Sequence, residues 1–427
     1  MFDDESLDAA QSPLDALCSQ HKALGDQVKA LGVDVVSLRQ EVEGLIQYLE
    51  CKGLVVSGEL DRRLGTEQRD LHGESLPRQQ PEAVPSRLGA AARALSRSRR
   101  RSSSPKVGAE LSTEERFVVL GGFVTRSDRN ASKTVEVLKA SHSDIWKPLP
   151  DIPWCRGHHT AAVLGGCLYV CGGHFNPVMR SLIRFDTRKW AWQTLKQMGT
   201  PRREPAAAAF AGHLYVCGGE HESSVWSSVE RFRPDCDRRE GGFWEEVPSM
   251  SYRRRGFAAV ALHDSIIVCG GIAQSWRTQR QDQPALASAE VLRRGAKAWE
   301  TAHQMTVPRF YHAMVALEGE AIAIGGLDSN HGAVVGYVES FDPLLGRWTQ
   351  LAPLLRPRFL HVAGVLAGRV YICGGFHEES VDDPSLSSAE CFDPEAGEWT
   401  AAAPMLAPRA AFCGAVLVDA PDAAARE

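Results

Sequence analysis

The sequence predicts an all-β protein of six repeats, each a sheet of four short strands, preceded by an α-helical coiled coil and a disordered linker. Two observations indicate the repeats. An apolar run ending in a pair of glycines recurs six times from residue 117 onward, and a tryptophan follows each pair. The third observation is a heptad pattern of apolar residues within 14–49, which is typical of a coiled coil.

The glycine pairs recur with a period of about 50 residues. The six runs are FVVLGG (117–122), LYVCGG (168–173), LYVCGG (214–219), IIVCGG (266–271), AIAIGG (321–326) and VYICGG (370–375). Each is followed by a strand centred on a Val-Glu pair and then by Trp146, Trp192, Trp244, Trp299, Trp348 or Trp399. An Ala/Val-rich strand opens each period after an arginine, and these are Arg156, Arg203, Arg254, Arg309, Arg358 and Arg409.

Each period therefore predicts four strands, and such a sheet cannot cover both of its own faces. Stacking six sheets around an axis solves this, which predicts a six-bladed β-propeller over residues 115–419. The first glycine run follows the polar segment LSTEER (111–116) and has no Ala/Val strand before it, so the C-terminal strand 409–418 is expected to complete the first blade. Recurrent cysteines just before the glycines are interpreted as core residues: Cys171, Cys217, Cys269 and Cys373.

Taken together, the arginine, the glycine pair, the Val-Glu strand and the tryptophan resemble the Kelch repeat, which forms β-propellers. The resemblance covers residues 115–419. One departure is Arg184, placed where the other blades have glutamate, and another is Tyr337, where serine or threonine is usual.

Residues 1–72 are expected to form a helical segment. β-branched residues at heptad position a and leucine at d favour a parallel two-stranded coil, so a homodimer is predicted. One amphipathic helix packed on the propeller is the alternative. The dimerisation residues would be Leu17, Leu24, Val28, Leu31, Val35, Leu38, Val42 and Leu45.

Residues 73–114 are predicted to be a linker, and residues 420–427 a tail. Serine and arginine dominate the segment 97–106, whose simplest interpretation is a solvated spacer. A nuclear-import signal or a phosphorylated segment is the alternative. The net charge of −5, the absence of a long apolar run and the 11 scattered cysteines predict a cytoplasmic protein with free thiols, with the nucleus as the alternative.

The sequence contains no P-loop, GxGxxG, HExxH or GxSxG motif, so no catalytic residue, metal ligand or cofactor is predicted. Recurrent His159, His312 and His361 stand at one repeat position, which favours a structural role. A membrane or a nucleic acid is not expected as a partner.

The Kelch resemblance implies a binding face around the central channel. It would be lined by the six arginines and by the residues that open the Val-Glu strands, which are Thr134, Ser181, Ser228, Ser288, Tyr337 and Ser388. Guanidinium and hydroxyl groups suit an acidic or phosphorylated peptide. The alternative is that the arginines pair with neighbouring glutamates as part of the scaffold. Loops after the glycine pairs differ between blades and add His174, His221, Trp226, Trp276, Arg277, His331 and His377.

The predicted function is a protein-binding scaffold or adaptor that dimerises through its coil. Three alternatives remain open at this point. The Kelch resemblance also fits the substrate-recognition subunit of a cullin-type ubiquitin ligase, although no BTB domain is recognisable in the first 114 residues. The others are a protein that binds actin or the cytoskeleton, and an enzyme such as a sugar-acid epimerase.

Overall fold

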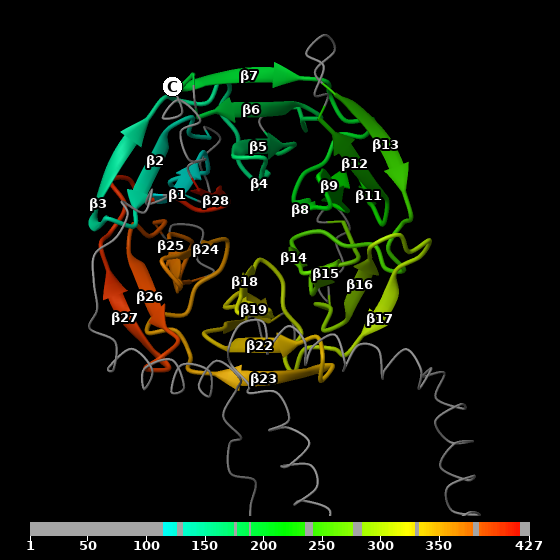
Figure 1. The fold of residues 1–427 in the computed structure, drawn as a ribbon. Coiled ribbons are helices and arrows are strands. Elements are labelled where there is room, and N and C mark those ends of the chain that lie inside the picture. Colours follow the sequence, from blue (N-terminus) through cyan, green and yellow to red (C-terminus); the bar gives the residue numbers. More distant parts are fainter. Residues whose placement is uncertain are drawn as a thin grey trace, which may run out of the picture. The chain divides into compact units, whose positions relative to one another are not determined.

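The computed structural model describes residues 114–125, 131–174, 177–187, 189–234, 242–275, 284–328, 333–378 and 384–418. Within these residues, six four-stranded antiparallel sheets stand as blades around a central axis (Figure 1). The predicted all-β, six-bladed propeller is therefore confirmed. The predicted coil, the basic segment and the tail lie outside the described residues.

Each blade is numbered from the strand nearest the axis outward. The first three blades are β28 (Cys413–Val418), β1 (Glu115–Leu120), β2 (Val135–Lys139) and β3 (His142–Leu149); β4 (Thr160–Leu164), β5 (Cys167–Cys171), β6 (Leu182–Asp186) and β7 (Ala191–Leu195); and β8 (Ala206–Phe210), β9 (His213–Cys217), β12 (Val229–Arg233) and β13 (Phe243–Val247).

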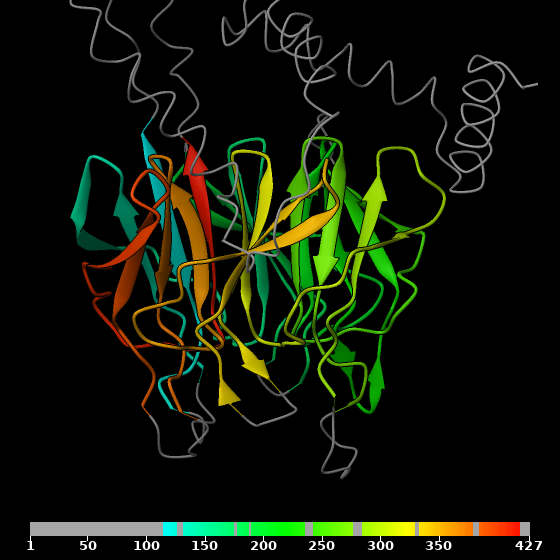
Figure 2. The ribbon, with the colours of Figure 1, turned by 90° about the horizontal axis from the view of Figure 1, so that it is seen from below.

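The other three blades follow the same order. They are β14 (Ala258–Leu262), β15 (Ser265–Cys269), β16 (Ala289–Arg293) and β17 (Glu300–Ala302); β18 (Ala313–Leu317), β19 (Glu320–Ile324), β22 (Val338–Asp342) and β23 (Arg347–Leu351); and β24 (Val362–Leu366), β25 (Arg369–Cys373), β26 (Ala389–Asp393) and β27 (Glu398–Ala402). Two small hairpins, β10 (Glu220–His221) with β11 (Ser224–Val225) and β20 (Leu327–Asp328) with β21 (Ala333–Val334), lie at the lower end in Figure 2.

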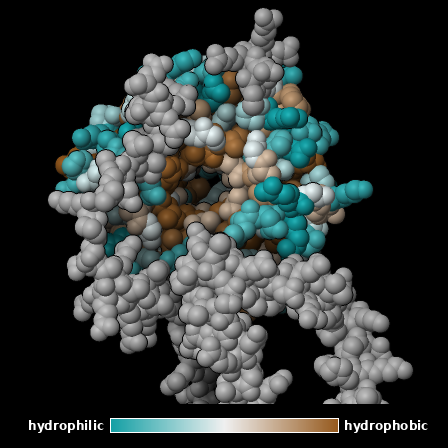
Figure 3. Space-filling model, in the orientation of Figure 1, coloured by the Kyte–Doolittle hydropathy of each residue, from teal (hydrophilic) through white to brown (hydrophobic). Residues whose placement is uncertain are grey.

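Burial along the strands explains their composition. The innermost strand β8 alternates between buried and half-buried residues: Ala206 and Ala208 pack toward the fourth blade, while Ala207 and Ala209 face the second blade. The second strand β15 is buried throughout, which accounts for its continuous apolar run. Figure 3 shows that hydrophobic residues border the central opening.

Each repeat tryptophan, in the outermost strand or directly before it, joins its blade to the preceding one. The indole of Trp146 donates a hydrogen bond of 2.9 Å to the carbonyl oxygen of Ala403, and that of Trp299 one of 2.8 Å to Pro248. Equivalent bonds leave the other four tryptophans. The rings therefore fill the space between blades and satisfy their one donor there.

The glycine pairs are required by the close approach of the next blade. Gly172 has a φ of +61°, and a Cβ placed on it would lie 2.5 Å from the carbonyl oxygen of Arg202. Both the left-handed backbone and the contact exclude any side chain.

The ring closes within one blade. Strand β28 pairs antiparallel with β1 from Glu115 opposite Val418 to Leu120 opposite Cys413. The last described strand thus forms the innermost strand of the first blade. In the described part of the chain, no helix is long and apolar enough to cross a membrane.

Candidate binding face around the central channel

The arginines of the repeat are buried in the scaffold. Arg254 is 0% exposed, and its guanidinium lies 2.9 Å from Glu290 and donates to the carbonyl oxygens of Gly270 and Ser288. Four further pairs have the same arrangement: Arg202 with Glu230, Arg309 with Glu339, Arg358 with Glu390 and Arg409 with Glu136. These arginines hold adjacent segments together and are not available to a partner, which corrects the predicted contact role.

In two blades, the sequence pattern placed a residue of the repeat one position too far toward the C-terminus. The buried arginine of the third blade is Arg202, which donates to Gly218 as Arg254 does to Gly270. Arg203 is the neighbour of that residue and lies at the channel. In the second blade the glutamate position is held by Ile183, which pairs with Val170 as Glu230 pairs with Val216. The predicted departure at Arg184 is therefore wrong.

The channel is encircled by six residues that each stand two positions after the buried arginine. The N–H of each donates to the carbonyl oxygen of the previous member, at 2.7–3.2 Å, and the sixth bond closes the circle. All six have a left-handed backbone, with φ between 52° and 60°. We call this set the rim: His158, Glu204, Gly256, Tyr311, Leu360 and Ala411. Its backbone is fixed by the fold, while its side chains differ in every blade.

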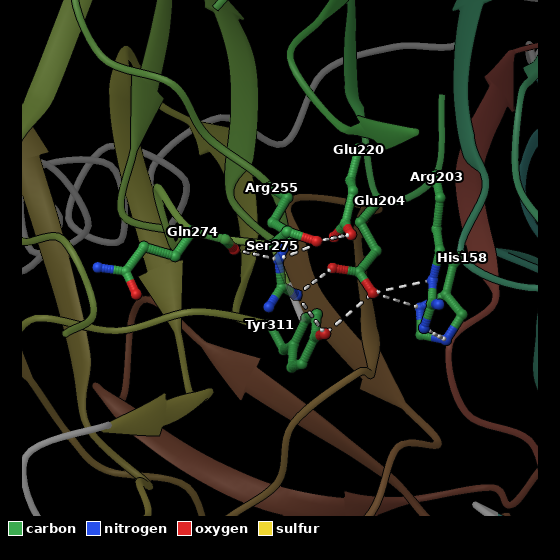
Figure 4. A network of polar contacts seen from close by, with 8 residues as sticks. All are labelled: His158, Arg203, Glu204, Glu220, Arg255, Gln274, Ser275 and Tyr311. Atoms are coloured by element: carbon green, nitrogen blue, oxygen red, sulfur yellow. Dashed lines mark hydrogen bonds and ion pairs between the residues drawn. The ribbon is translucent and has the colours of Figure 1, made fainter. Parts of the chain in front are cut away.

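Half of the rim is a polar network (Figure 4). Glu204 accepts hydrogen bonds from Arg255 at 2.8 Å and from the Tyr311 hydroxyl at 2.9 Å. Arg203 lies 3.3 Å from the Glu204 carboxylate and donates to Nε2 of His158, also at 3.3 Å. An arginine can only donate, so the proton of neutral His158 resides on Nδ1, which lies 3.4 Å from Glu204.

The network extends outward from the rim through Arg255. Its Nε lies 3.1 Å from a carboxylate oxygen of Glu220 and donates to the carbonyl oxygen of Gln274. Ser275 donates its hydroxyl proton to the other oxygen of Glu220. The Arg255 guanidinium thus joins two carboxylates of the third blade, Glu204 and Glu220, to the loop that follows the glycine pair of the fourth blade.

Burial and the arginine charges set the protonation of this network. Burial, with a further contribution from the charge of Arg203, lowers the pKa of His158 to about 3. Burial opposes ionisation of Glu204, but the charges of Arg203 and Arg255 outweigh it and lower its pKa to about 2. At neutral pH the network therefore holds a neutral imidazole and an ionised carboxylate.

The rest of the rim is apolar or small. Gly256, Leu360 and Ala411 make up this part, and outside the rim the ring of Phe123 lies 5.7 Å from that of His158. Together with the residues below it, the rim encloses a cavity of about 100 Å³. Small-molecule sites usually measure about 300–1,000 Å³, so this cavity fits one inserted side chain.

The predicted hydroxyl set has a mixed outcome. Ser228 and Ser288 each accept a hydrogen bond from the buried arginine, and Thr134 and Ser388 do the same. Ser181 is half-buried. Tyr337 gives only its carbonyl oxygen to Arg309, and its side chain is 45% exposed.

The predicted loop residues surround the rim in part. His174 is half-buried, and its backbone forms an isolated β-bridge with that of Gly157. Nδ1 of His377 lies 2.8 Å from the carbonyl oxygen of Pro357. His221 and Trp226 are half-buried on and beside the hairpin of β10 and β11. Trp276, Arg277 and His331 lie outside the described residues.

Sequence reasoning missed His158, Glu204, Arg255 and Tyr311. A signal for the rim was present, because its position is variable within a motif that otherwise recurs in every blade. In the described residues, no group of three or more His, Cys, Asp or Glu side chains could hold a metal ion. The buried thiols before the glycines have pKa values raised by burial, and Cys171 is raised to about 12.

Comparison with known proteins gives the same picture of the repeat. A family model described as the Kelch motif matches residues 155–199, 308–355 and 357–406. Kelch-like protein 36 of Rattus norvegicus is 28% identical over 301 residues, which are 68% of this chain and 47% of that protein. Beta-scruin of Limulus polyphemus is 29% identical over 195 residues, 45% of this chain and 20% of that protein. The chain thus spans about half the length of Kelch-like protein 36 and a smaller share of beta-scruin.

A solved structure, titled Structure of YjhT, superposes with a TM-score of 0.55 at 17% identity. The match covers 62% of this chain and 89% of that one. At this identity the likeness concerns the propeller fold alone.

Proposed function

Since this chain is a Kelch-repeat protein whose described residues fold as a six-bladed propeller, we propose that it is a protein-binding scaffold that holds a partner over the rim. One observation carries the proposal. The repeat fixes the backbone of the rim through six hydrogen bonds but leaves its side chains free to vary. Variable side chains on a rigid circle are the usual construction of a recognition site.

The shape of the rim supports a protein partner. Its cavity of about 100 Å³ fits one side chain of a partner loop, with Leu360 and Ala411 on one side and the polar network on the other. The Arg203 side chain is 19% exposed, so its guanidinium suits a carboxylate or phosphate near that side chain. The loops after the glycine pairs stand around the same end and would add contact area.

Affinity capture from cell lysate tests the proposal, with full-length wild type compared with Leu360→Arg. The added side chain would fill the cavity without removing a network contact. Leu344→Arg is the matched control, because Leu344 is 61% exposed in a turn at the opposite end of the blades. We expect Leu360→Arg to lose a partner that wild type and Leu344→Arg both retain, with all three showing the same thermal unfolding. Retention by Leu360→Arg would contradict the proposal.

The identity of the captured protein decides between the classes of adaptor. Cullin subunits would assign the chain to a ubiquitin ligase, and actin would assign it to the cytoskeleton. Dimerisation through Leu24, Leu31 and Leu38 is part of the same proposal, since two propellers on one coil raise the effective concentration. Light scattering of the full chain should give the mass of a dimer, and Leu31→Pro should give the mass of a monomer.

A further inference from the structure

A groove lies between the third and fourth blades, at the end of the blades away from the rim. Cys269, next to a glycine pair, is opposite Ala289, whereas Ser265 at the other end of β15 is opposite Arg293. The groove is bounded by Arg293 and the turn after it on one side and by the turn between β8 and β9 on the other. It has a volume of about 420 Å³.

The floor of the groove is apolar and departs from the repeat. Phe210 closes β8 opposite His213, and its ring lies 6.0 Å from that of Tyr215. Leu292 of the fourth blade completes the floor. The residue equivalent to Phe210 is leucine in the four blades that share this hairpin register: Leu164, Leu262, Leu317 and Leu366. The aromatic ring is therefore not a requirement of the scaffold.

The basic wall also departs from the repeat. The fourth blade turns after Arg293 with the residues Arg294, Gly295, Ala296 and Lys297. Three other blades have aspartate at the Arg293 position, and its carboxylate accepts a backbone N–H of the turn at 2.8–3.2 Å: Asp186, Asp342 and Asp393. The fourth blade lacks this stabilising hydrogen bond, because the cationic Arg293 stands in place of the aspartate.

The cations that line the groove differ in whether they are paired. Arg231 is paired with Glu245 at 2.7 Å, and Arg293 with Glu300 at 3.3 Å. Arg294 and Lys297 are exposed, and neither has an ion pair among the residues that the structure describes. The Arg294 guanidinium lies 5.6 Å from the centre of the Phe210 ring. Among the residues that the structure describes, Glu246 is the one acid that lines the groove.

We propose that this groove binds an acidic peptide segment of a partner protein. An apolar side chain of the peptide would lie on Phe210, Tyr215 and Leu292, while neighbouring carboxylates would contact Arg294 and Lys297. A nucleic acid would require a longer row of cations along its backbone. Hydrophilic side chains gather over the β14–β17 blade in Figure 3. The site is separate from the rim, so one propeller would bind two different partners, one at each end.

A random peptide library displayed on phage tests this on the full-length protein. We expect the selected peptides to be rich in aspartate and glutamate beside an aromatic or aliphatic residue. As synthetic fluorescent peptides they should bind Arg294→Glu/Lys297→Glu at least about tenfold more weakly than wild type. Phe210→Leu, which introduces the residue of the sister blades, should weaken binding without loss of folding.

The control Lys189→Glu/Arg347→Glu makes the same change of charge at the same end of other blades, in the turn before β7 and at the start of β23. It should bind like wild type. Equal loss in both double variants would mean a general effect of charge and would overturn the proposal, as would peptides without acidic enrichment. Single-stranded RNA that binds in place of peptides, and is lost in the first double variant, would also overturn it. Leu360→Arg should leave peptide binding unchanged, which separates this site from the rim.

Discussion

Arg156 and Ile183 stand at the two repeat positions that hold an ion-paired arginine and glutamate at the other five sites around the ring. Arg156 is 0% exposed, and only its Nη1 makes a hydrogen bond, to the carbonyl oxygen of Gly172. Its Nε and Nη2 have no partner among the described residues. Burial lowers its pKa to about 10. The adjoining segment has adapted as well, because Pro153 stands where Gly199 donates its N–H to Glu230 in the next blade.

The first prediction concerns the two kinds of buried arginine. Arg254→Met should lower the free energy of unfolding by about 3–5 kcal/mol, because Glu290 would be left buried and unpaired. Arg156→Met leaves no charge behind, so it should change stability by less than about 1 kcal/mol or increase it. Denaturant unfolding followed by circular dichroism measures both. Equal losses would contradict this account of Arg156.

The second prediction restores the missing pair. Ile183→Glu should be tolerated with Arg156 present and be strongly destabilising in the Arg156→Met background. A double-mutant cycle should give a favourable coupling of about 1–3 kcal/mol between the two positions. Additive effects would show that the two side chains do not interact.

The third prediction concerns pH. Burial lowers the pKa of His361 to about 3 and that of His312 well below its ordinary value. Both are neutral in the folded state, whereas the unfolded chain binds a proton below about pH 6.5. Their contribution to stability is therefore complete above pH 6.5 and is lost as the pH falls, by up to about 2 kcal/mol for each histidine at pH 5.

Phenylalanine occupies the same repeat position in two other blades, at Phe257 and Phe412. His312→Phe/His361→Phe should accordingly unfold with less dependence on pH between 7 and 5. Thermal unfolding across this range measures it, and parallel curves for wild type and the double variant would contradict the assignment.

The sequence made the blades predictable because scaffold residues recur. The glycines, tryptophans and buried strands each have one structural role, repeated six times, so their spacing carried the information. The arginine of the third blade was misplaced because Arg202 and Arg203 are adjacent. Arg202 is separated from Gly218 by the same number of residues as Arg254 is from Gly270, and this spacing identifies Arg202 as the buried arginine.

The position of the rim stands out in the sequence, but the contacts that its side chains make were not predictable, for a physical reason. Its network joins Glu204, Arg255 and Tyr311, which come from three different blades and meet only when the ring forms. Their residue types share no pattern along the chain. The groove at Phe210 and Arg294 was missed likewise, because it depends on two departures from the repeat in separate blades.

The fourth prediction tests ring closure. Truncation after Met405 removes β28 and Arg409, which leaves one edge of β1 unpaired and Glu136 buried without its partner. The midpoint of thermal unfolding should fall, with increased aggregation. Truncation after Val418 keeps β28 and should unfold like the full chain. Equal midpoints for both truncations would contradict closure through this strand.

The central claim is that a partner is held over the rim, and a photo-crosslinking residue placed at position 360 tests it most directly. The same residue at position 344, at the opposite end of the blades, is the comparison. After illumination of the complex with the captured partner, the account predicts a covalent adduct from position 360 and none from position 344. An adduct from position 344 alone would contradict it.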